Sequence, residues 1–116
     1  MKHFKLKEFA CPCCKKADMD LEFLDMIDDA RALAKKPFII NSGFRCKEWN
    51  LKVGGRVGSS HVKGYAADIH CNNSRDRAII IDAVAHAGFN RIGIAKNFIH
   101  IDNDPKKDKV VIWLYQ

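Results

Sequence analysis

Three residues have the types and spacing of a metal centre. His61 ends a stretch rich in Gly and Ser, Asp68 follows it in the segment Tyr65–His70, and His100 lies within Phe98–Asp102. If the last two segments are strands, alternation places Asp68 and His100 on polar faces and their apolar neighbours behind. Two imidazoles and one carboxylate suit Zn²⁺ and leave a fourth coordination position for water, as in catalytic zinc sites.

Each of these residues, taken alone, is more often solvated or hydrogen-bonded than bound to a metal. The same interpretation applies to the remaining histidines, His3, His70 and His86. The argument for a metal centre therefore depends on the three residues acting together.

The elements that must position these side chains follow from the hydrophobic pattern. It predicts two main helices, over 20–36 and from Ser74 as the N-cap to Gly88, and a short helix over 47–52. In the second main helix, a shared apolar face is predicted for Ala78, Ile81, Val84 and Ala85. Strands are predicted over 38–41 (buried), 65–70, 91–95, 98–102 and 109–115, with a hairpin joining 91–95 to 98–102. This order indicates one α+β domain over residues 1–116, with a mostly antiparallel sheet.

Residues 59–68 read Ser-x-His-x-x-Gly-x-Ala-x-Asp. This string resembles the zinc signature of the D-Ala-D-Ala carboxypeptidases (peptidase family M15), which cut peptidoglycan and share a fold with the hedgehog signalling domain. The resemblance extends to residues 40–45 and 98–102, and residues 4–11 look like the opening of the small single-domain branch of the family. It therefore covers nearly the whole chain.

The resemblance implies a hedgehog/DD-peptidase-like fold and one catalytic Zn²⁺ held by His61, Asp68 and His100. The implied reaction is hydrolysis of a peptide bond next to a D-amino acid in a cell-wall stem peptide. Arg45 would face the substrate, because a guanidinium group holds a carboxylate through two parallel hydrogen bonds. Ser59 would add a hydroxyl group to this anchor. The alternative for Arg45 is a surface salt bridge with a residue such as Glu48.

The general base is where the chain departs from the family. Some members have a Glu three residues before the last His ligand, where this chain has Asn97, and others have a His two residues before it, where this chain has Phe98. The remaining carboxylate, Asp102, is either the base or an acceptor that orients a ligand imidazole. His70 is a weaker candidate for the base, and Asn97 is a candidate for stabilising the oxyanion.

Composition restricts the class of protein. Hydrophobic residues make up 47% of the chain and charged residues 29%, an ordinary globular balance, and the net charge of +6 is spread along the chain. Basic residues are not interleaved with aromatic ones on a strand, so we expect no nucleic-acid partner. No segment approaches the roughly 20 apolar residues of a membrane span, and residues 1–9 are too charged for a signal peptide.

We therefore expect a monomer, made in the cytoplasm without a signal peptide, whose partner is a peptidoglycan peptide in the cell wall. A phage-encoded, endolysin-like enzyme released by other means fits this description. The alternative is a catalytically impaired zinc-containing module that binds a wall peptide or a protein partner.

The chain has five cysteines, Cys11, Cys13, Cys14, Cys46 and Cys71. An odd number argues against a complete disulfide framework. The interpretation that we favour from the sequence is thiols without a metal. The alternative is a metal site in which Cys11 and Cys14, at C-x-x-C spacing, are joined by Cys46 or Cys71.

Overall fold

The computed structural model describes residues 1–115. The predicted domain of residues 1–116 ends at Gln116, which lies outside the described residues. The elements are the 3₁₀ helix η1 (Leu6–Phe9), α1 (Leu21–Ala34), β1 (Ile40–Ser42), α2 (Lys47–Lys52), β2 (Ala66–His70), α3 (Ser74–His86), β3 (Arg91–Ile94), β4 (Phe98–Asp102) and β5 (Val111–Leu114). The α+β class is confirmed. Across residues 1–115, no helix combines the length and the apolar character needed to cross a membrane.

The strands described in residues 1–115 form one five-stranded sheet in the order β1-β2-β4-β3-β5. Neighbouring strands are antiparallel except β5, which runs parallel to β3. The sheet is therefore mixed, and the prediction of a mostly antiparallel sheet is corrected. The loop over residues 103–110 leaves β4 at the end that lies beside the start of β3. Strand β5 consequently begins next to Arg91 and runs in the direction of β3.

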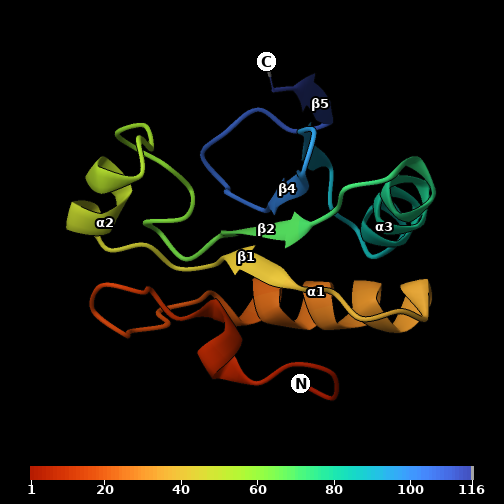
Figure 1. The fold of residues 1–116 in the computed structure, drawn as a ribbon, viewed down its shortest axis with the longest axis horizontal. Helices are drawn as coiled ribbons and strands as arrows, with labels where there is room; N and C mark the ends of the chain where they lie inside the picture. The colour runs from red at the N-terminus through yellow and green to blue at the C-terminus, as the bar shows by residue number, and fades with distance from the viewer. Residues whose placement is uncertain (116) are drawn as a thin grey trace.

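The hydrophobic core lies between the sheet and the two longer helices, α1 and α3. The helices contribute Phe23, Leu24, Ile27, Ala30, Ile80, Ala83 and Val84, and the strands contribute Ala67, Ile69, Ile92, Ile99 and Ile101. In Figure 1, α1 lies below the strands and α3 at the right, whereas α2 lies at the left, away from α3. Because alternate residues of β2 and β4 enter this core, the residues between them face the opposite side of the sheet.

Local corrections concern the edges of the elements. Asn73, not Ser74, is the N-cap of α3, because its side chain accepts a hydrogen bond from the backbone N–H of Asp76. The buried face of this helix consists of Ile80, Ala83 and Val84, whereas Ala78 and Ala85 of the predicted face are exposed. The predicted buried strand over 38–41 lies instead at 40–42, and it is partly exposed because it forms an edge of the sheet.

Candidate metal centre

The three predicted ligands are brought together on the face of the sheet opposite the core. Asp68 of β2 and His100 of β4 are direct partners in the strand pairing. His61 comes from the loop before β2. All three side chains are buried, and one possible ligand atom from each lies within 4.8 Å of the others. Local strand alternation and the pairing of β2 with β4 therefore produce the cluster.

The orientation of each imidazole suits a metal ion. His61 Nδ1 lies 2.8 Å from the carbonyl oxygen of Gly43, and its Nε2 lies 3.3 Å from Asp68 Oδ1. His100 Nε2 lies 2.8 Å from Asp102 Oδ2, and its Nδ1 lies 2.9 Å from the same Asp68 oxygen. One nitrogen of each ring is thus held by an oxygen outside the cluster, while the other points at Asp68. Histidine ligands of zinc are oriented in this way, so the residues fit Zn²⁺.

The carboxylates and imidazoles of the cluster perturb one another. Burial alone would raise the pKa of Asp68, but hydrogen bonds from His100 and His61 bring that pKa far below its usual range. Burial alone would lower the pKa of His100, but the carboxylates of Asp102 and Asp68 raise it above its ordinary value. Burial alone would also raise the pKa of Asp102. The contacts with His100 and Arg91 stabilise its charged form and lower the pKa below its ordinary value. Each charged form is therefore stabilised by its neighbours.

The predicted substrate residues lie beside this cluster. Arg45 Nε donates to Ser42 Oγ (3.0 Å), its Nη1 donates to Asn50 Oδ1 (3.2 Å), and its Nη2 lies 3.5 Å from Asp68 Oδ2. Among residues 1–115, no ion pair joins Arg45 to Glu48, the alternative partner. Ser59 Oγ accepts a hydrogen bond from the backbone N–H of His61 at 3.2 Å. Arg45 is therefore directed toward Asp68.

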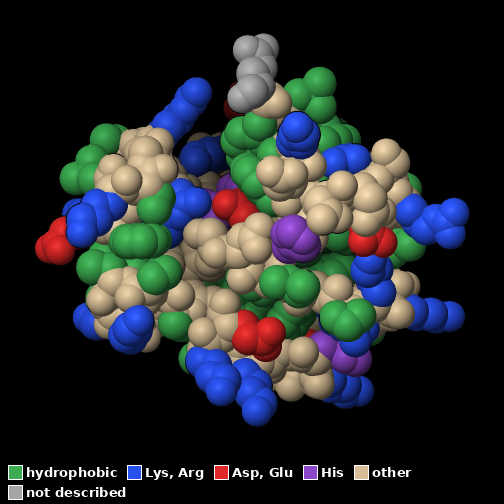
Figure 2. All heavy atoms as spheres, in the orientation of Figure 1, with side chains coloured by type: hydrophobic (Ala, Val, Ile, Leu, Met, Phe, Trp, Pro, Cys, Tyr) green, Lys and Arg blue, Asp and Glu red, His purple; other side chains and the backbone are tan. Residues whose placement is uncertain are grey.

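A cavity of about 780 Å³ lies over the cluster. The predicted site residues that line it are Arg45, Ser59, His61, Asp68, His100 and Asp102. Figure 2 shows a hollow on the visible face, between the side formed by α2 and the side formed by β5, with charged side chains inside it. Two further candidates are not brought into the site, since His70 and Asn97 are exposed and do not line the cavity.

Sequence reasoning missed the wall of this cavity that β5 provides. Trp113 and Tyr115 line it, and their rings lie 5.5 and 6.5 Å from the ring of His100. They have room because β3 carries Gly93 there, where an added Cβ would lie 2.6 Å from Tyr115 Cε2. The sequence places Trp113 and Tyr115 two residues apart, on one face of the last predicted strand. Only the parallel pairing of β5 with β3 shows that this face lines the cavity.

A half-buried charged residue, Arg91, and a buried polar residue, Asn50, were also missed. Arg91 Nε donates to Asp102 Oδ1 at 2.7 Å, and its guanidinium group lies 5.1 Å from the centre of the Trp113 ring. Asn50, which holds Arg45, also donates to the carbonyl oxygen of Arg56 at 3.0 Å. Both residues fix groups that line the cavity, and no short motif in the sequence marks them.

The chain is similar to known peptidases over most of its length. A family model described as Peptidase M15 matches residues 2–102. The zinc D-Ala-D-Ala carboxypeptidase of Streptomyces albus G is 36% identical over 61 residues, which are 53% of this chain and 24% of that protein. The chain thus aligns with about a quarter of the length of this relative. The family match ends at Asp102, so that β5 with Trp113, and Tyr115 directly after it, lie beyond the match. The match covers well over half of the chain, which therefore belongs to the peptidase M15 family.

Proposed function

We propose that the protein is a zinc metallopeptidase that hydrolyses peptide bonds in the stem peptides of bacterial peptidoglycan. The observation that carries this proposal is the convergence of ligand atoms from His61, Asp68 and His100 in a cavity that Arg45 also lines. The Streptomyces albus G relative, which is named as a zinc D-Ala-D-Ala carboxypeptidase, supports the substrate class.

The three ligand side chains would hold one Zn²⁺. When bound, this ion would polarise the scissile carbonyl group and make water a stronger nucleophile at neutral pH. Arg45 would hold a carboxylate of the stem peptide, with Ser42 and Asn50 fixing the plane of its guanidinium group. The hydroxyl group of Ser59 would add a second contact to this carboxylate. Trp113 and Tyr115 would cover the peptide from the β5 side and reduce its contact with water.

We assign Asp102 the positioning role of the two that the sequence left open. Its side chain is 1% exposed, and both oxygens are engaged: Oδ2 with His100, and Oδ1 with Arg91 and the backbone N–H of Asp104. A general base must reach the proton that it removes. A carboxylate enclosed by these contacts is better suited to fix the ring of His100, whose Nδ1 faces Asp68 and would be available to hold the ion.

A second candidate function is a zinc-containing module that binds a wall peptide or a protein partner without cutting it. The observation that favours it concerns the proton acceptor. Of the cavity-lining residues within 1–115, the carboxylates are Asp68 and Asp102, and both are occupied by histidine or arginine side chains. A cavity without a carboxylate free to accept a proton is expected of such a module.

One preparation tests both functions. Metal content and hydrolysis of a muramyl pentapeptide ending in D-Ala-D-Ala are measured for the wild type, for His61→Ala and for His86→Ala as the matched control. His86 is exposed at the end of α3 and is not among the residues that line the cavity. If the protein is a zinc peptidase, the wild type and His86→Ala cleave the peptide and His61→Ala does not. The product masses identify the bond that is cut. Bound zinc and bound peptide without products would establish the binding module, and a wild type without zinc would refute both.

The same assay tests the role of Arg45. A pentapeptide whose C-terminal carboxylate is converted to an amide lacks the partner proposed for the guanidinium group. If Arg45 binds that carboxylate, kcat/KM falls for the amide in the wild type but is equal for the two peptides in Arg45→Gln. An equal rate for both peptides in the wild type would refute this assignment.

A further inference from the structure

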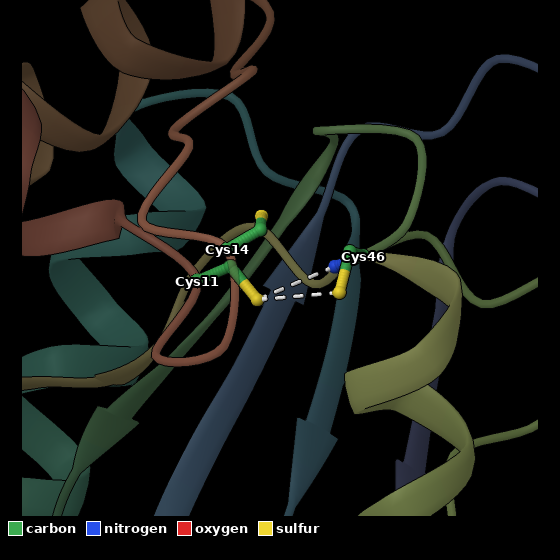
Figure 3. A group of neighbouring side chains, drawn as sticks. All are labelled: Cys11, Cys14 and Cys46. Atoms are coloured by element: carbon green, nitrogen blue, oxygen red, sulfur yellow. Dashed lines mark hydrogen bonds between the residues drawn. The ribbon is translucent and has the colours of Figure 1, made fainter.

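A second cluster of metal-ligand side chains lies outside the cavity. Cys11 and Cys14 belong to a turn near the N-terminus, and Cys46 lies at the start of α2 (Figure 3). Their thiol sulfur atoms all lie within 4.8 Å of one another. None of the three residues lines the cavity over His61, Asp68 and His100. The peptidase site therefore makes no use of them.

The backbone of the turn holds two of these thiols at a fixed separation. The N–H of Lys15 donates to the carbonyl oxygen of Cys11 at 2.8 Å, and the N–H of Cys11 donates to that of Lys16 at 2.7 Å. Lys15 adopts the left-handed conformation, with φ of 65°, which reverses the chain directly after Cys14. The C-x-x-C spacing is thus closed into a compact loop that presents both sulfur atoms.

The distance between thiols from different segments matches zinc geometry. Sulfur ligands lie about 2.3 Å from a tetrahedral Zn²⁺, which puts neighbouring sulfur atoms about 3.8 Å apart. Cys11 Sγ and Cys46 Sγ are 3.7 Å apart. A disulfide would require about 2.05 Å and would join only two of the three thiols. The arrangement therefore resembles a set of metal ligands more than an unformed disulfide.

Backbone N–H groups point at the sulfur atoms, as they do around bound thiolates. The N–H of Cys46 lies 3.5 Å from Cys11 Sγ, and the N–H of Trp49 lies 3.5 Å from Cys46 Sγ. These two contacts fix the positions of the Cys11 and Cys46 sulfur atoms.

We propose that Cys11, Cys14 and Cys46 bind a structural Zn²⁺, separate from the site at His61, Asp68 and His100. These are the three thiols that the fold brings together, whereas Cys13 is exposed and is not part of the set. The remaining cysteine, Cys71, is excluded, because its thiol lies against the carbonyl oxygen of Asn73.

The proposed ion would fasten the N-terminal segment to residues 42–46. These two parts of the chain already meet at Phe9, whose carbonyl oxygen accepts a hydrogen bond from the N–H of Phe44 at 2.8 Å. They approach so closely that a Cβ added at Gly43 would lie 2.7 Å from the backbone of Phe9. A metal ion bound at the cysteines would hold the N-terminal turn against Cys46, close to the contact between Phe9 and Phe44. Because Arg45 directly precedes Cys46, the ion would also fix the backbone that carries Arg45.

The test uses Co²⁺ as the probe, because Co²⁺ takes tetrahedral sites and absorbs in the near ultraviolet when thiolates bind it. The full chain is reduced, stripped of metal and reloaded, and the metal content per chain is measured with the spectrum. The doubly substituted variant His61→Ala/His100→Ala removes the other site. Cys46→Ser removes one thiol but keeps an oxygen that can cap α2. Cys71→Ser is the control for a Cys→Ser substitution outside the thiol cluster.

We expect two ions per wild-type chain and one ion with thiolate absorption in His61→Ala/His100→Ala. Adding Cys46→Ser to that background should bring the content to none and abolish the absorption, whereas adding Cys71→Ser should change neither. Wild-type protein without thiolate absorption would overturn the proposal even if a variant failed to fold. Absorption that survives Cys46→Ser would also overturn it. The proposal would also be overturned if the unreduced protein had a mass lower than that of the reduced protein by two hydrogen atoms, because this difference indicates a disulfide.

Discussion

Replacement of Asp102 by Asn separates the two roles considered for this residue. The carboxylate accepts hydrogen bonds on both oxygens, at 2.8 Å from His100 Nε2 and at 2.7 Å from Arg91 Nε. An amide has a single oxygen. If that oxygen faces Arg91 and the N–H of Asp104, the NH₂ group faces His100 and requires Nε2 to accept. The proton of the neutral ring then moves to Nδ1, the nitrogen that faces Asp68.

The size of the effect follows from this change of tautomer. A ring protonated on Nδ1 cannot offer that nitrogen to a metal. Loss of a carboxylate that orients a ligand imidazole typically weakens metal binding by about 10- to 100-fold. This corresponds to about 1.4–2.7 kcal/mol of binding free energy. Loss of a general base would instead lower kcat by about 10²- to 10⁴-fold and leave metal affinity intact.

The assay therefore measures two quantities on the same protein. Zinc affinity is obtained by competition with a chromophoric chelator, and kcat is measured at saturating zinc with the pentapeptide. For Asp102→Asn we expect weaker zinc binding and a kcat that recovers most of its wild-type value when zinc is in excess. His70→Gln is the matched control, because His70 is an exposed residue of β2 outside the cavity, and it should change neither quantity. Unchanged zinc affinity with a collapsed kcat would refute the positioning role.

Further predictions concern substrate binding, packing and the N-terminus. Arg45→Lys should lower kcat/KM about 10- to 100-fold, since an ammonium group cannot form two parallel hydrogen bonds; a matching loss of zinc content would show that the effect arises at the metal instead. Gly93→Ala should destabilise the fold by about 1–3 kcal/mol in urea unfolding, because the new Cβ would lie 2.7 Å from the Trp113 ring; an unchanged midpoint would contradict this. Asp28 accepts hydrogen bonds from two backbone N–H groups near the N-terminus, which lower its pKa although burial opposes them. Its stabilisation is present above the unfolded pKa of about 3.9 and is lost as pH falls through the lower folded value, so Asp28→Asn should cost about 0.5–1 kcal/mol at pH 7 but little at pH 2; an equal loss at both pH values would contradict this.

The parts of the fold that local pattern determines could be predicted from the sequence. The helix over Lys47–Lys52 and the hairpin of β3 and β4 depend on neighbouring residues, and both are confirmed. The N-cap of α3 shifted by one residue because Asn73 and Ser74 are both good capping residues, and only geometry chooses between them. The parallel direction of β5 depends on where a loop crosses the end of the sheet, which no local pattern encodes.

The candidate site divides in the same way. The convergence of His61, Asp68 and His100 follows from strand alternation together with a motif of recognisable spacing. The aromatic wall could not be predicted, because Trp113 reaches His100 only where β5 runs beside β3. Ser42 and Asn50 lie within five residues of Arg45, but their contacts with its guanidinium group depend on how the chain turns between β1 and α2.

Residues 42–46 serve both clusters described above from a single short span of backbone. The carbonyl oxygen of Gly43 holds His61, the side chain of Arg45 faces Asp68, and Cys46 belongs to the thiol cluster. A ligand bound at one cluster restricts the motion of this span. Less conformational entropy is then lost when a ligand binds at the other cluster. Such coupling is reciprocal by thermodynamic necessity, so occupancy at either cluster would favour occupancy at the other by the same factor. With metal bound at both clusters as proposed, the span would make them a linked pair rather than independent sites.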